Sequence, residues 1–268
     1  MTLRVVTAVL VSALSSVQRR FGNQTTYKVG PDGAAAQFEG AWFAYRPKQF
    51  GSTGNIDSQL DAENETRRAL VARLSGNETF WDIGAHGGVY TITLRRQFPA
   101  LRLHSFEPQP EDLLENLRLN GLSGETVHRV AVGAQPGIVK MTTKARSSNH
   151  VSESGDRSVS MVRLDDYAAE HSLPLPGWIK IDIEGLELPA LRGAERILRE
   201  SQPNVICEIN HLFGRYGSTI SDLVDYMAGF GLKPHRLTNG DLHLVERPRT
   251  LQDLGYSADN NFWFMRSG

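Results

Sequence analysis

The stretch Thr79-Phe80-Trp81-Asp82-Ile83-Gly84-Ala85-His86-Gly87-Gly88 decides the fold that we expect for this chain. Its first half is a short apolar run, which predicts a buried strand that breaks at Gly84. Residues 89–98 follow with the pattern of a helix, which Pro99 ends. Glycines, which lack a Cβ, let a ligand approach the backbone between the strand and the helix, and Asp82 ends the strand at that place. A glycine-rich turn of this kind is weak support for a ligand site on its own.

Strands and helices continue to alternate after this turn. Apolar periodicity predicts further strands at 101–106, 126–132, 178–183 and 204–209. Helical patterns follow the first, third and fourth of these strands, and Asn239-Gly240 is a strong hairpin signal before a last strand at 261–265. This order predicts an α/β fold with a doubly wound mixed sheet. In such sheets the ligand crevice lies beyond the carboxyl ends of the strands.

Residues 1–75 have a different pattern, and we expect an N-terminal helix and hairpin extension before a main domain at 76–268. The apolar run at 5–14 is shorter than the roughly 20 residues that span a bilayer, and no A-x-A cleavage pattern follows it. We therefore expect a packed amphipathic helix there and no transmembrane segment. Glycines punctuate residues 22–55 in the manner of hairpins and loops, and a polar helix then leads into the main domain.

Composition excludes several classes of protein. The 268 residues are 40% hydrophobic and 22% charged, which is ordinary for a globular protein and unlike collagen, coiled coil or disordered chains. The 29 Lys and Arg against 30 Asp and Glu leave a formal charge of −1, so no positive field gathers nucleic acid. A single cysteine, Cys207, cannot form an intrachain disulfide. We expect a reduced, cytoplasmic setting and a partner other than nucleic acid.

Glu107 ends the second predicted strand, 19 residues after Gly88. A carboxylate at that place suits the two hydroxyls of a ribose, so the glycine turn and Glu107 together imply a cofactor that carries a nucleoside. Asp82 helps to separate two such cofactors. A carboxylate beside the turn would repel a pyrophosphate, but it would attract the positively charged amino-acid group of S-adenosylmethionine. The residues therefore favour S-adenosylmethionine over a nicotinamide dinucleotide.

A third group of polar residues is Lys180-Ile181-Asp182-Ile183-Glu184-Gly185-Leu186-Glu187, in which three acids surround one strand end. A solvated acidic turn would explain Glu187 and Glu184. Asp182 lies on the strand itself and ends it at the predicted crevice. A carboxylate there could hold the amine of the cofactor, orient a substrate hydroxyl or contribute to a divalent metal site.

With these stretches in place, the chain resembles the FkbM family of S-adenosylmethionine-dependent methyltransferases, on the seven-stranded, Rossmann-like class I methyltransferase fold. The Lys-Ile-Asp-Ile-Glu-Gly stretch is the most specific match. His86 departs from the family, which usually has Asn there, although imidazole can still donate and accept one hydrogen bond. The matching stretches run in family order across about residues 77–210: Asp82–Thr91, Ser105–Pro110, Ala131–Gly133, Leu164–Tyr167, Lys180–Gly185 and Leu191–Ala194.

The resemblance implies a role for each matching position. The methionine part of the cofactor would lie against the glycine turn, Glu107 would hold the ribose, and Asp182 would serve both the cofactor and the reaction. The cofactor-binding residues implied in this way are Asp82, Gly84, Ala85, His86, Gly88, Glu107, Ala131, Val132 and Asp182. Family members commonly methylate hydroxyls of polyketides, glycans or other secondary metabolites. Residues 1–75 and the polar loop at 144–157 carry little family signal, and we expect them to shape the acceptor pocket.

Methyl transfer from a sulfonium to a hydroxyl needs the acceptor oxygen held roughly 3–3.5 Å from the methyl carbon. A general base then removes the proton. His211 is the leading candidate, because it follows the fifth strand and titrates near neutrality. His150 in the polar loop is weaker. Oxygens of Asp182, Glu208 and Asn210 could bind Mg²⁺, but we rank catalysis without a metal above that variant.

Two other functions stay open at this point. A NAD-dependent oxidoreductase would use a similar strand, turn and ribose acid, but it should show a clean G-x-G-x-x-G, whereas residues 84–89 are Gly-Ala-His-Gly-Gly-Val. A catalytically silent protein that binds S-adenosylmethionine and recognises a partner would carry the same motifs. Binding of each cofactor, and turnover on hydroxylated acceptors, would separate the three functions.

Overall fold

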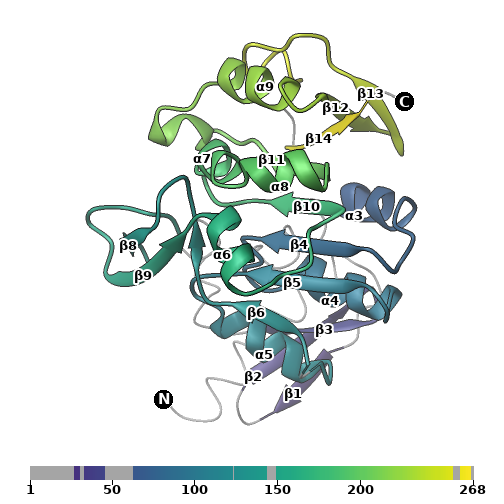
Figure 1. Cartoon of the computed structure of the whole chain (residues 1–268). Helices are drawn as coiled ribbons and strands as arrows, with labels where there is room; N and C mark the ends of the chain where they lie inside the picture. Colours follow the sequence, from purple (N-terminus) through teal and green to yellow (C-terminus); the bar gives the residue numbers. More distant parts are fainter. Residues whose placement is uncertain are drawn as a thin grey trace.

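The structure is a computed structural model, and it describes residues 27–30, 33–45, 63–122, 124–143, 149–255 and 260–266. The helix expected at the apolar run 5–14 lies outside the described residues. Figure 1 gives the arrangement of the elements. No helix among the described residues is long and apolar enough to cross a membrane.

The strands are β1 (Tyr27–Gly30), β2 (Gly33–Phe38), β3 (Ala41–Tyr45), β4 (Thr79–Ile83), β5 (Arg102–Phe106), β6 (Thr126–His128), β7 (Ala131–Val132), β8 (Gly137–Met141), β9 (Arg157–Val162), β10 (Trp178–Ile181), β11 (Asn204–Glu208), β12 (Leu232–Thr238), β13 (Asp241–Leu244) and β14 (Asn261–Arg266). The helices are α3 (Asn64–Val71), α4 (Val89–Gln97), α5 (Glu111–Leu119), α6 (Leu164–Glu170), α7 (Glu187–Arg192), α8 (Glu195–Glu200) and α9 (Ile220–Ala228), with a 3₁₀ helix, η4 (Phe213–Tyr216).

The main sheet has the strand order β13-β12-β14-β11-β10-β4-β5-β6. Strands β11, β10, β4, β5 and β6 are parallel, and β14 runs antiparallel to both β11 and β12. The predicted doubly wound mixed sheet is confirmed. It has eight strands within the described residues rather than seven, because the expected Asn239-Gly240 hairpin adds β13 at the edge.

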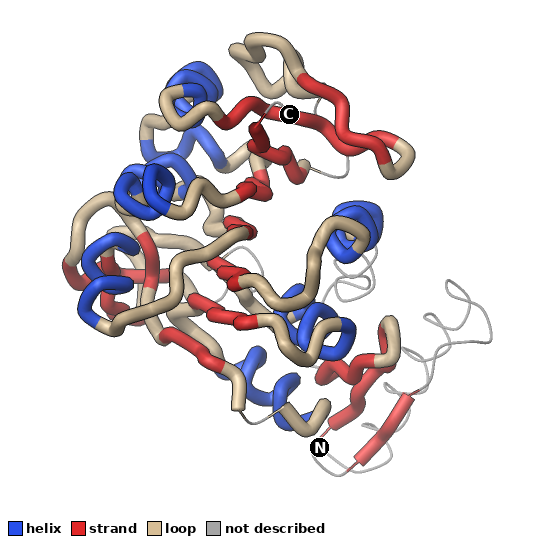
Figure 2. The backbone as a smooth tube through the Cα atoms, turned by 45° about the vertical axis from the view of Figure 1, so that its right-hand side comes forward, coloured by secondary structure: helices blue, strands red, loops and turns tan. Residues whose placement is uncertain are grey.

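Helices cover both faces of this sheet, as Figure 2 shows. On one face the side chains of Ile181, Leu191 and Leu223 join a core beneath α6 to α9. On the other face Leu70 of α3 and Tyr90 of α4 pack with further strand residues. A strand with apolar groups on both faces reads as a continuous apolar run, which is why the sequence locates β4, β10 and β11 well.

The predicted strand 126–132 is two strands. β6 ends at His128, and β7 leaves the main sheet to pair with β9 in a second sheet with the order β7-β9-β8. Figure 1 shows β8 and β9 standing out from the body of the molecule. The polar loop predicted at 144–157 is only partly described. Within it Val151 forms an isolated bridge with Met141, and β9 already begins at Arg157.

The expected hairpins in residues 22–55 are present as the antiparallel sheet β1-β2-β3. Two side chains of α5 tie β3 to the main body. Asn120 accepts from the Trp42 N–H (2.8 Å) and donates to the Trp42 carbonyl (2.6 Å), as a neighbouring strand would. Asn116 accepts from the Ala44 N–H (2.7 Å). The division of the chain near residues 75 and 76 stays a prediction.

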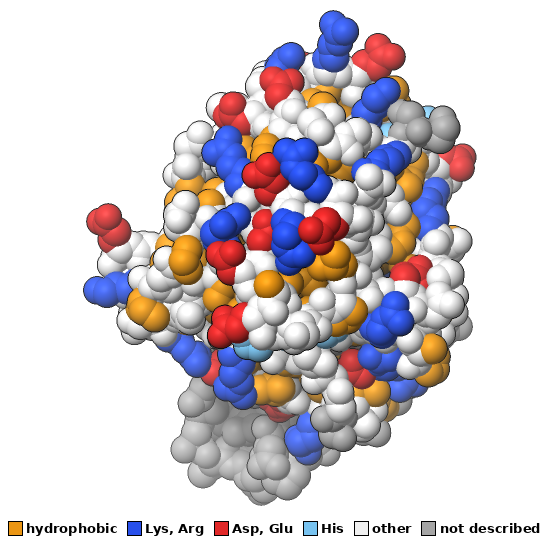
Figure 3. Space-filling model, viewed as in Figure 1, with side chains coloured by type: hydrophobic (Ala, Val, Ile, Leu, Met, Phe, Trp, Pro, Cys, Tyr) orange, Lys and Arg blue, Asp and Glu red, His pale blue; other side chains and the backbone are white. Residues whose placement is uncertain are grey.

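Charges on the surface are mixed in sign. Figure 3 shows Lys and Arg side chains lying among Asp and Glu on the face that it presents. Two examples are the exposed pairs Arg196–Glu200 and Arg199–Glu195 along α8, each with an N–O distance of 2.8 Å. Pairs of this kind contribute about 0.3–0.5 kcal/mol each.

Candidate active site

Sheet register places the predicted site residues in two rows at the carboxyl ends of the central strands. Lys180 lies beside Asp82, and Asp82 beside Ser105, so these side chains share one face. Backbone hydrogen bonds extend the ladder one residue past the strands, through the N–H groups of Asp182, Gly84 and Glu107. The second row, two residues further along each strand, therefore runs Glu208, Asp182, Gly84 and Glu107.

Gly84 and Gly88 are required by contacts inside the protein. Both have positive φ, +83° and +79°, which favours glycine. A Cβ on Gly84 would lie 1.9 Å from the carbonyl oxygen of Asp182, and one on Gly88 would lie 2.3 Å from the Leu113 side chain. We expected these glycines to leave room for a ligand. The structure adds another reason for glycine at position 84, which is that the turn packs directly on the Asp182 backbone.

The carboxylate of Glu107 is buried and held at both oxygens. The backbone N–H of His86 donates to one oxygen and that of Gln109 to the other, each at 2.8 Å. Burial raises the pKa of Glu107, and these hydrogen bonds oppose the rise. A carboxylate has about four lone-pair positions, so both oxygens keep capacity to accept from a ligand.

Asp82 is buried at the end of β4, where the Thr91 hydroxyl donates to it (2.7 Å) and in turn contacts the Ser105 hydroxyl (2.7 Å). Burial raises the pKa of Asp82 to about 6, although the Thr91 hydrogen bond and the charge of Lys180 act in the opposite direction. α4 thus fixes the orientation of Asp82. An acid in this state gains from a nearby positive charge, which would favour its ionised form.

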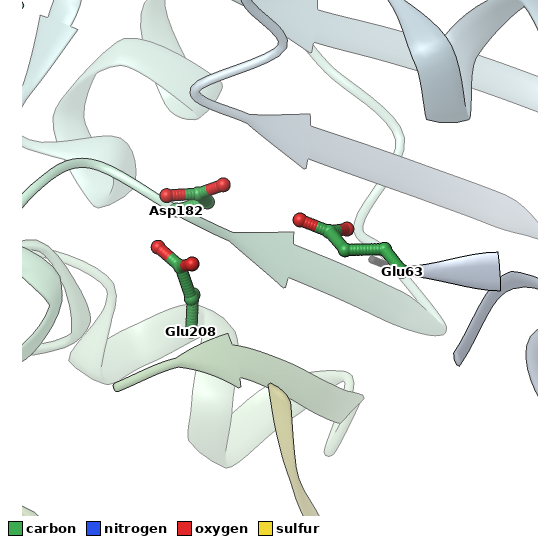
Figure 4. A group of neighbouring side chains, drawn as sticks. All are labelled: Glu63, Asp182 and Glu208. Carbon is green, nitrogen blue, oxygen red and sulfur yellow. The ribbon is translucent and has the colours of Figure 1, made fainter. Parts of the chain in front are cut away.

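Asp182, Glu208 and Glu63 form a carboxyl cluster, drawn in Figure 4. One oxygen of each lies within 4.8 Å of the others. Asp182 and Glu208 come from adjacent parallel strands, as predicted, whereas Glu63 precedes α3 and was not foreseen. A divalent cation could bridge such oxygens. The cluster already has a positive charge beside it, however. The buried ammonium of Lys180 lies 3.4 Å from Asp182 and over the Tyr90 ring.

The pKa values of Asp182 and Glu208 are shifted in opposite directions. Burial alone would raise the pKa of Asp182, but Lys180 and a hydrogen bond with Glu208 lower it below its usual range. Burial, the charge of Asp182 and the same hydrogen bond raise the pKa of Glu208 to about 11. Burial would lower the pKa of Lys180, but the carboxylates around it, led by Asp182, raise it. These shifts favour an ionised Asp182, a protonated Glu208 and a charged Lys180.

Glu187 shapes the loop that follows Asp182. Its buried carboxylate accepts from the N–H groups of Ile183 (3.1 Å) and Gly185 (3.0 Å), and burial raises its pKa to about 7. The expectation of a solvated Glu187 was wrong, since the side chain belongs to the first turn of α7 and points back into the loop. Glu184 is half-buried, and its pKa is also raised to about 7 by burial and by Asp182.

The other predicted residues lie at different distances from these rows. Ala131 and Val132 are buried in β7, beyond β6. His211 is exposed in the turn after β11. Asn210 donates to Glu208 (3.0 Å) and to Glu184 (3.5 Å), so it joins the cluster as a hydrogen-bond donor rather than as a further anion.

The strand order, with an antiparallel β14 between β11 and β12, and the polar rows at the carboxyl edge define a class I methyltransferase. Residues 82–234 match the family described as "Methyltransferase FkbM domain", which is more than half of the chain. The chain belongs to this family, and it is an S-adenosylmethionine-dependent methyltransferase.

The relatives of this chain are distant in sequence. Hexuronic acid methyltransferase AglP of Haloferax volcanii is 25% identical over 157 residues, covering 56% of this chain and 64% of that protein. The 31-O-demethyl-FK506 methyltransferase FkbM of Streptomyces tacrolimicus is 24% identical over 186 residues, covering 55% and 71%. Methyltransferase 1 of Beauveria bassiana is 24% identical over 167 residues, covering 52% and 67%. This chain thus spans about two thirds of the length of these relatives.

A solved structure of a methyltransferase FkbM from Methylobacillus flagellatus KT aligns with a TM-score of 0.48 and 22% identity. That alignment covers 72% of this chain and 44% of the other.

Proposed function

We propose that this chain transfers the methyl group of S-adenosylmethionine to a hydroxyl oxygen of a small molecule or a carbohydrate. The observation that supports it best is the row formed by Glu107, Gly84, Asp182 and Glu208 along one edge of the sheet. Neighbouring strands lie about 4.8 Å apart, so about 10 Å separates a carboxylate suited to a ribose from an ionised carboxylate suited to a proton.

The chemistry of the donor set fits the cofactor. Glu107 is oriented by two backbone N–H groups and keeps an acceptor position on each oxygen, which suits a pair of ribose hydroxyls. Asp82 and the glycine turn would hold the charged methionine part. By family resemblance we assign the cofactor-binding role to Asp82, Gly84, Ala85, His86, Gly88, Glu107, Ala131, Val132 and Asp182.

The bound cofactor supplies a methyl group that is activated by its sulfonium. The protein must hold the acceptor oxygen in line with that group and remove the hydroxyl proton. A hydroxyl becomes strongly acidic as its oxygen is methylated, so a carboxylate of low pKa suffices as the base. Asp182 is the base that this geometry favours, because Lys180 keeps it ionised within the row. His211, exposed in its turn, is the second candidate.

A chain of contacts surrounds the carboxyl edge and would border the acceptor. Gln109 donates to the Thr142 carbonyl (3.2 Å) and accepts from Asn149 (3.3 Å), which links Glu107 to the β8–β9 region. Tyr216 of η4 donates to the Val151 carbonyl on the far side of that region. Polar side chains of this kind suit a hydroxylated acceptor. The methylation of a hexuronic acid by one relative is consistent with a sugar.

Calorimetry tests the cofactor assignment. We expect S-adenosylmethionine to bind and NAD not to bind, and Glu107→Ala to weaken S-adenosylmethionine about tenfold or more. Glu111→Ala is the control, since Glu111 is an exposed acid on the neighbouring helix that pairs with Arg157 (2.6 Å). The proposal fails if S-adenosylmethionine does not bind at millimolar concentration, or if Glu107→Ala binds it as the unchanged protein does.

A screen of sugar, polyketide and phenolic hydroxyls, with mass detection of a methyl gain, tests the reaction. With the acceptor found, Asp182→Asn and His211→Ala identify the base. We expect Asp182→Asn to lose about 10²–10⁴-fold in turnover, and His211→Ala to keep it. Cofactor binding without turnover on any acceptor would instead indicate the silent binding protein.

A further inference from the structure

We propose that Asn116 of α5 is a positioning residue of the cofactor site: its side-chain amide holds the turn after β4 in the conformation that directs the His86 N–H to Glu107. The inference concerns the affinity for S-adenosylmethionine, so it goes beyond the proposed hydroxyl methylation. Asn116 lies outside the sequence stretches on which the family resemblance rests.

His86 has a left-handed backbone conformation, with φ +45°. Residues with a Cβ rarely adopt this region, and they keep it only where the surrounding contacts fix it. The conformation has a use here, because the His86 N–H donates to one carboxylate oxygen of Glu107 (2.8 Å). A return of His86 to negative φ would turn this N–H away from Glu107. The turn therefore needs a support that holds it as it is.

Asn116 provides a support at the next residue of the turn. Its Nδ2 donates to the carbonyl oxygen of Gly87 (2.8 Å), and its Oδ1 accepts from the N–H of Ala44 in β3 (2.7 Å). One partner is an acceptor and the other a donor, so only one orientation of the amide satisfies both. The side chain is buried, where water does not readily replace a lost partner.

The helix that carries Asn116 packs on the same turn. Leu113 of α5 belongs to a buried apolar cluster with Ala85 of the turn and Phe43 of β3. A Cβ on Gly88 would lie 2.3 Å from the Leu113 side chain, so helix and turn are in close contact. Asn116 is therefore fixed from both sides and does not follow the turn if the turn moves.

The cofactor would sense this support through Glu107. Without the His86 N–H, the Glu107 carboxylate would lose one of the two hydrogen bonds that orient it. The orientation suited to a pair of ribose hydroxyls would then be populated less often. The apparent affinity for a ligand falls in proportion to the population of the state that binds it.

Calorimetric titration with S-adenosylmethionine tests the inference. Asn116→Asp keeps the acceptor for the Ala44 N–H and loses the donor to Gly87, whereas Asn116→Ala loses both. We expect each variant to bind about fivefold to tenfold more weakly, as for the loss of one hydrogen bond. Asn116→Asp preserves the size of the side chain, so it serves if Asn116→Ala does not fold.

Asn120→Ala is the control for a general loss of stability. Asn120 lies one helical turn further along, and its side chain bonds to backbone groups of Trp42 and Asn116. Its removal should destabilise the packing of β3 on α5 and leave the affinity for S-adenosylmethionine unchanged.

The amide of His86 gives a readout that needs no ligand. Ala85-His86 is the only Ala-His pair in the sequence, so carbonyl ¹³C-alanine and ¹⁵N-histidine labels select its NMR signal. In the unchanged protein the amide proton should resonate downfield, as expected for a donor to a carboxylate. It should move upfield in both Asn116 variants and stay in place in Asn120→Ala.

A double-mutant cycle tests whether Asn116 acts through residue 86. His86→Gly removes the steric cost of the positive φ, because glycine adopts this region readily. Asn116→Asp should therefore weaken S-adenosylmethionine less in the His86→Gly background than in the unchanged one. Equal losses in the two backgrounds would show that Asn116 does not act through this residue, and the inference would be wrong.

Unchanged affinity in the Asn116 variants would also overturn the inference, as would a His86 signal that does not move or an equal loss of affinity in Asn120→Ala. A chain that binds no S-adenosylmethionine would contradict the cofactor assignment and this inference together. Binding without methylation of any hydroxyl would contradict only the proposed function.

Discussion

Around the ammonium of Lys180 lie carboxyl groups from four separate parts of the chain: Asp82 on β4, Asp182 after β10, Glu208 at the end of β11, and Glu63 before α3. Isolated buried carboxylates are costly because burial disfavours charge. The lysine offsets this cost for Asp182, and Glu208 avoids it by keeping its proton. The site therefore maintains one reactive carboxylate by arranging its neighbours.

Glu187 stabilises the loop between β10 and α7 through hydrogen bonds to its backbone. Glu187→Ala removes the acceptor for the N–H groups of Ile183 and Gly185, and should lower the free energy of unfolding by about 2–3 kcal/mol. Glu187→Gln keeps an acceptor oxygen. Because the pKa is raised to about 7, wild-type stability from this group is present below the unfolded value of 4.5 and lost as the pH rises through about 7.

Urea unfolding at pH 5.5 and 8.5 measures both effects. Glu187→Gln should gain stability relative to the unchanged protein at the higher pH, by about 1–3 kcal/mol. A constant difference between the two proteins at both pH values would contradict the buried, proton-linked role of Glu187.

The residues that could be predicted from sequence are those that end strands. Asp82, Glu107 and Asp182 each follow an apolar run, and parallel strands bring their ends to one edge. Lys180 lies inside such a run, so its charge carried no signal of its partners. Glu63 has neither motif nor periodicity, since it reaches the site through the packing of α3. Its presence follows from tertiary structure alone.

Two asparagines of α5 contact both the N-terminal sheet and the glycine turn after β4. Asn116 and Asn120, one turn apart, meet backbone groups of β3, and Asn116 also donates to the carbonyl of Gly87 (2.8 Å) in the glycine turn. One helix therefore connects the N-terminal sheet with the cofactor turn. Asn120 lies at the C-terminal end of α5, and its contact with β3 joins residues that are 78 positions apart in the chain.

Asn120→Ala should loosen β3 without unfolding the main sheet. The Trp42 N–H would lose its acceptor, so hydrogen exchange at that amide should accelerate about fivefold to tenfold, from the loss of about 1 kcal/mol. Asn120→Asp is the matched variant, because it keeps the acceptor oxygen and loses the amide donor to the Trp42 and Asn116 carbonyls. Mass-spectrometric exchange on residues 41–45 measures the effect, and equal protection in the unchanged and Asn120→Ala chains would contradict it.

The helical patterns that follow the predicted strands are present in the structure, but their boundaries depend on local contacts. Thr219 and Asp222 form a capping box at the start of α9. The helical pattern that follows the predicted strand at 178–183 is two short helices, α7 and α8, that meet at Gly193 and Ala194. A Cβ on Gly193 would lie 2.3 Å from the carbonyl oxygen of Gly133, so this position between the two helices requires glycine. Periodicity cannot reveal it, because the apolar spacing continues across the break.

For the whole molecule, burial raises the pKa of several acids at one edge: Asp82, Glu107, Glu184, Glu187 and Glu208. Such groups bind more protons in the folded state than in the unfolded state. The stability that they contribute is therefore greatest below about pH 4 and falls as the pH rises through about 6 to 7. A cation bound at this edge would reverse part of that loss.

S-adenosylmethionine carries positive charge, so we expect it to bind more tightly at higher pH. Binding should release protons from the edge acids, and the dissociation constant should fall about threefold to tenfold from pH 6 to pH 8. Calorimetry in two buffers of different ionisation enthalpy counts the protons. S-adenosylhomocysteine, which lacks the sulfonium charge, should show a smaller dependence. Affinity that is independent of pH, or that weakens as the pH rises, would contradict this linkage.

The absence of a Cβ at Gly84 also bears on how this chain can diversify. The turn after β4 rests on the carbonyl of Asp182, so neither loop can be rebuilt in evolution or in the laboratory without rebuilding the other. We therefore expect sequence variation mainly in the β8–β9 region and in the segment before α3. Both meet the carboxyl edge of the main sheet through side chains. A library that randomises Gln109, Thr142 and Asn149 should change which molecules the enzyme methylates. The turn after β4 and the loop after β10 should instead change only together.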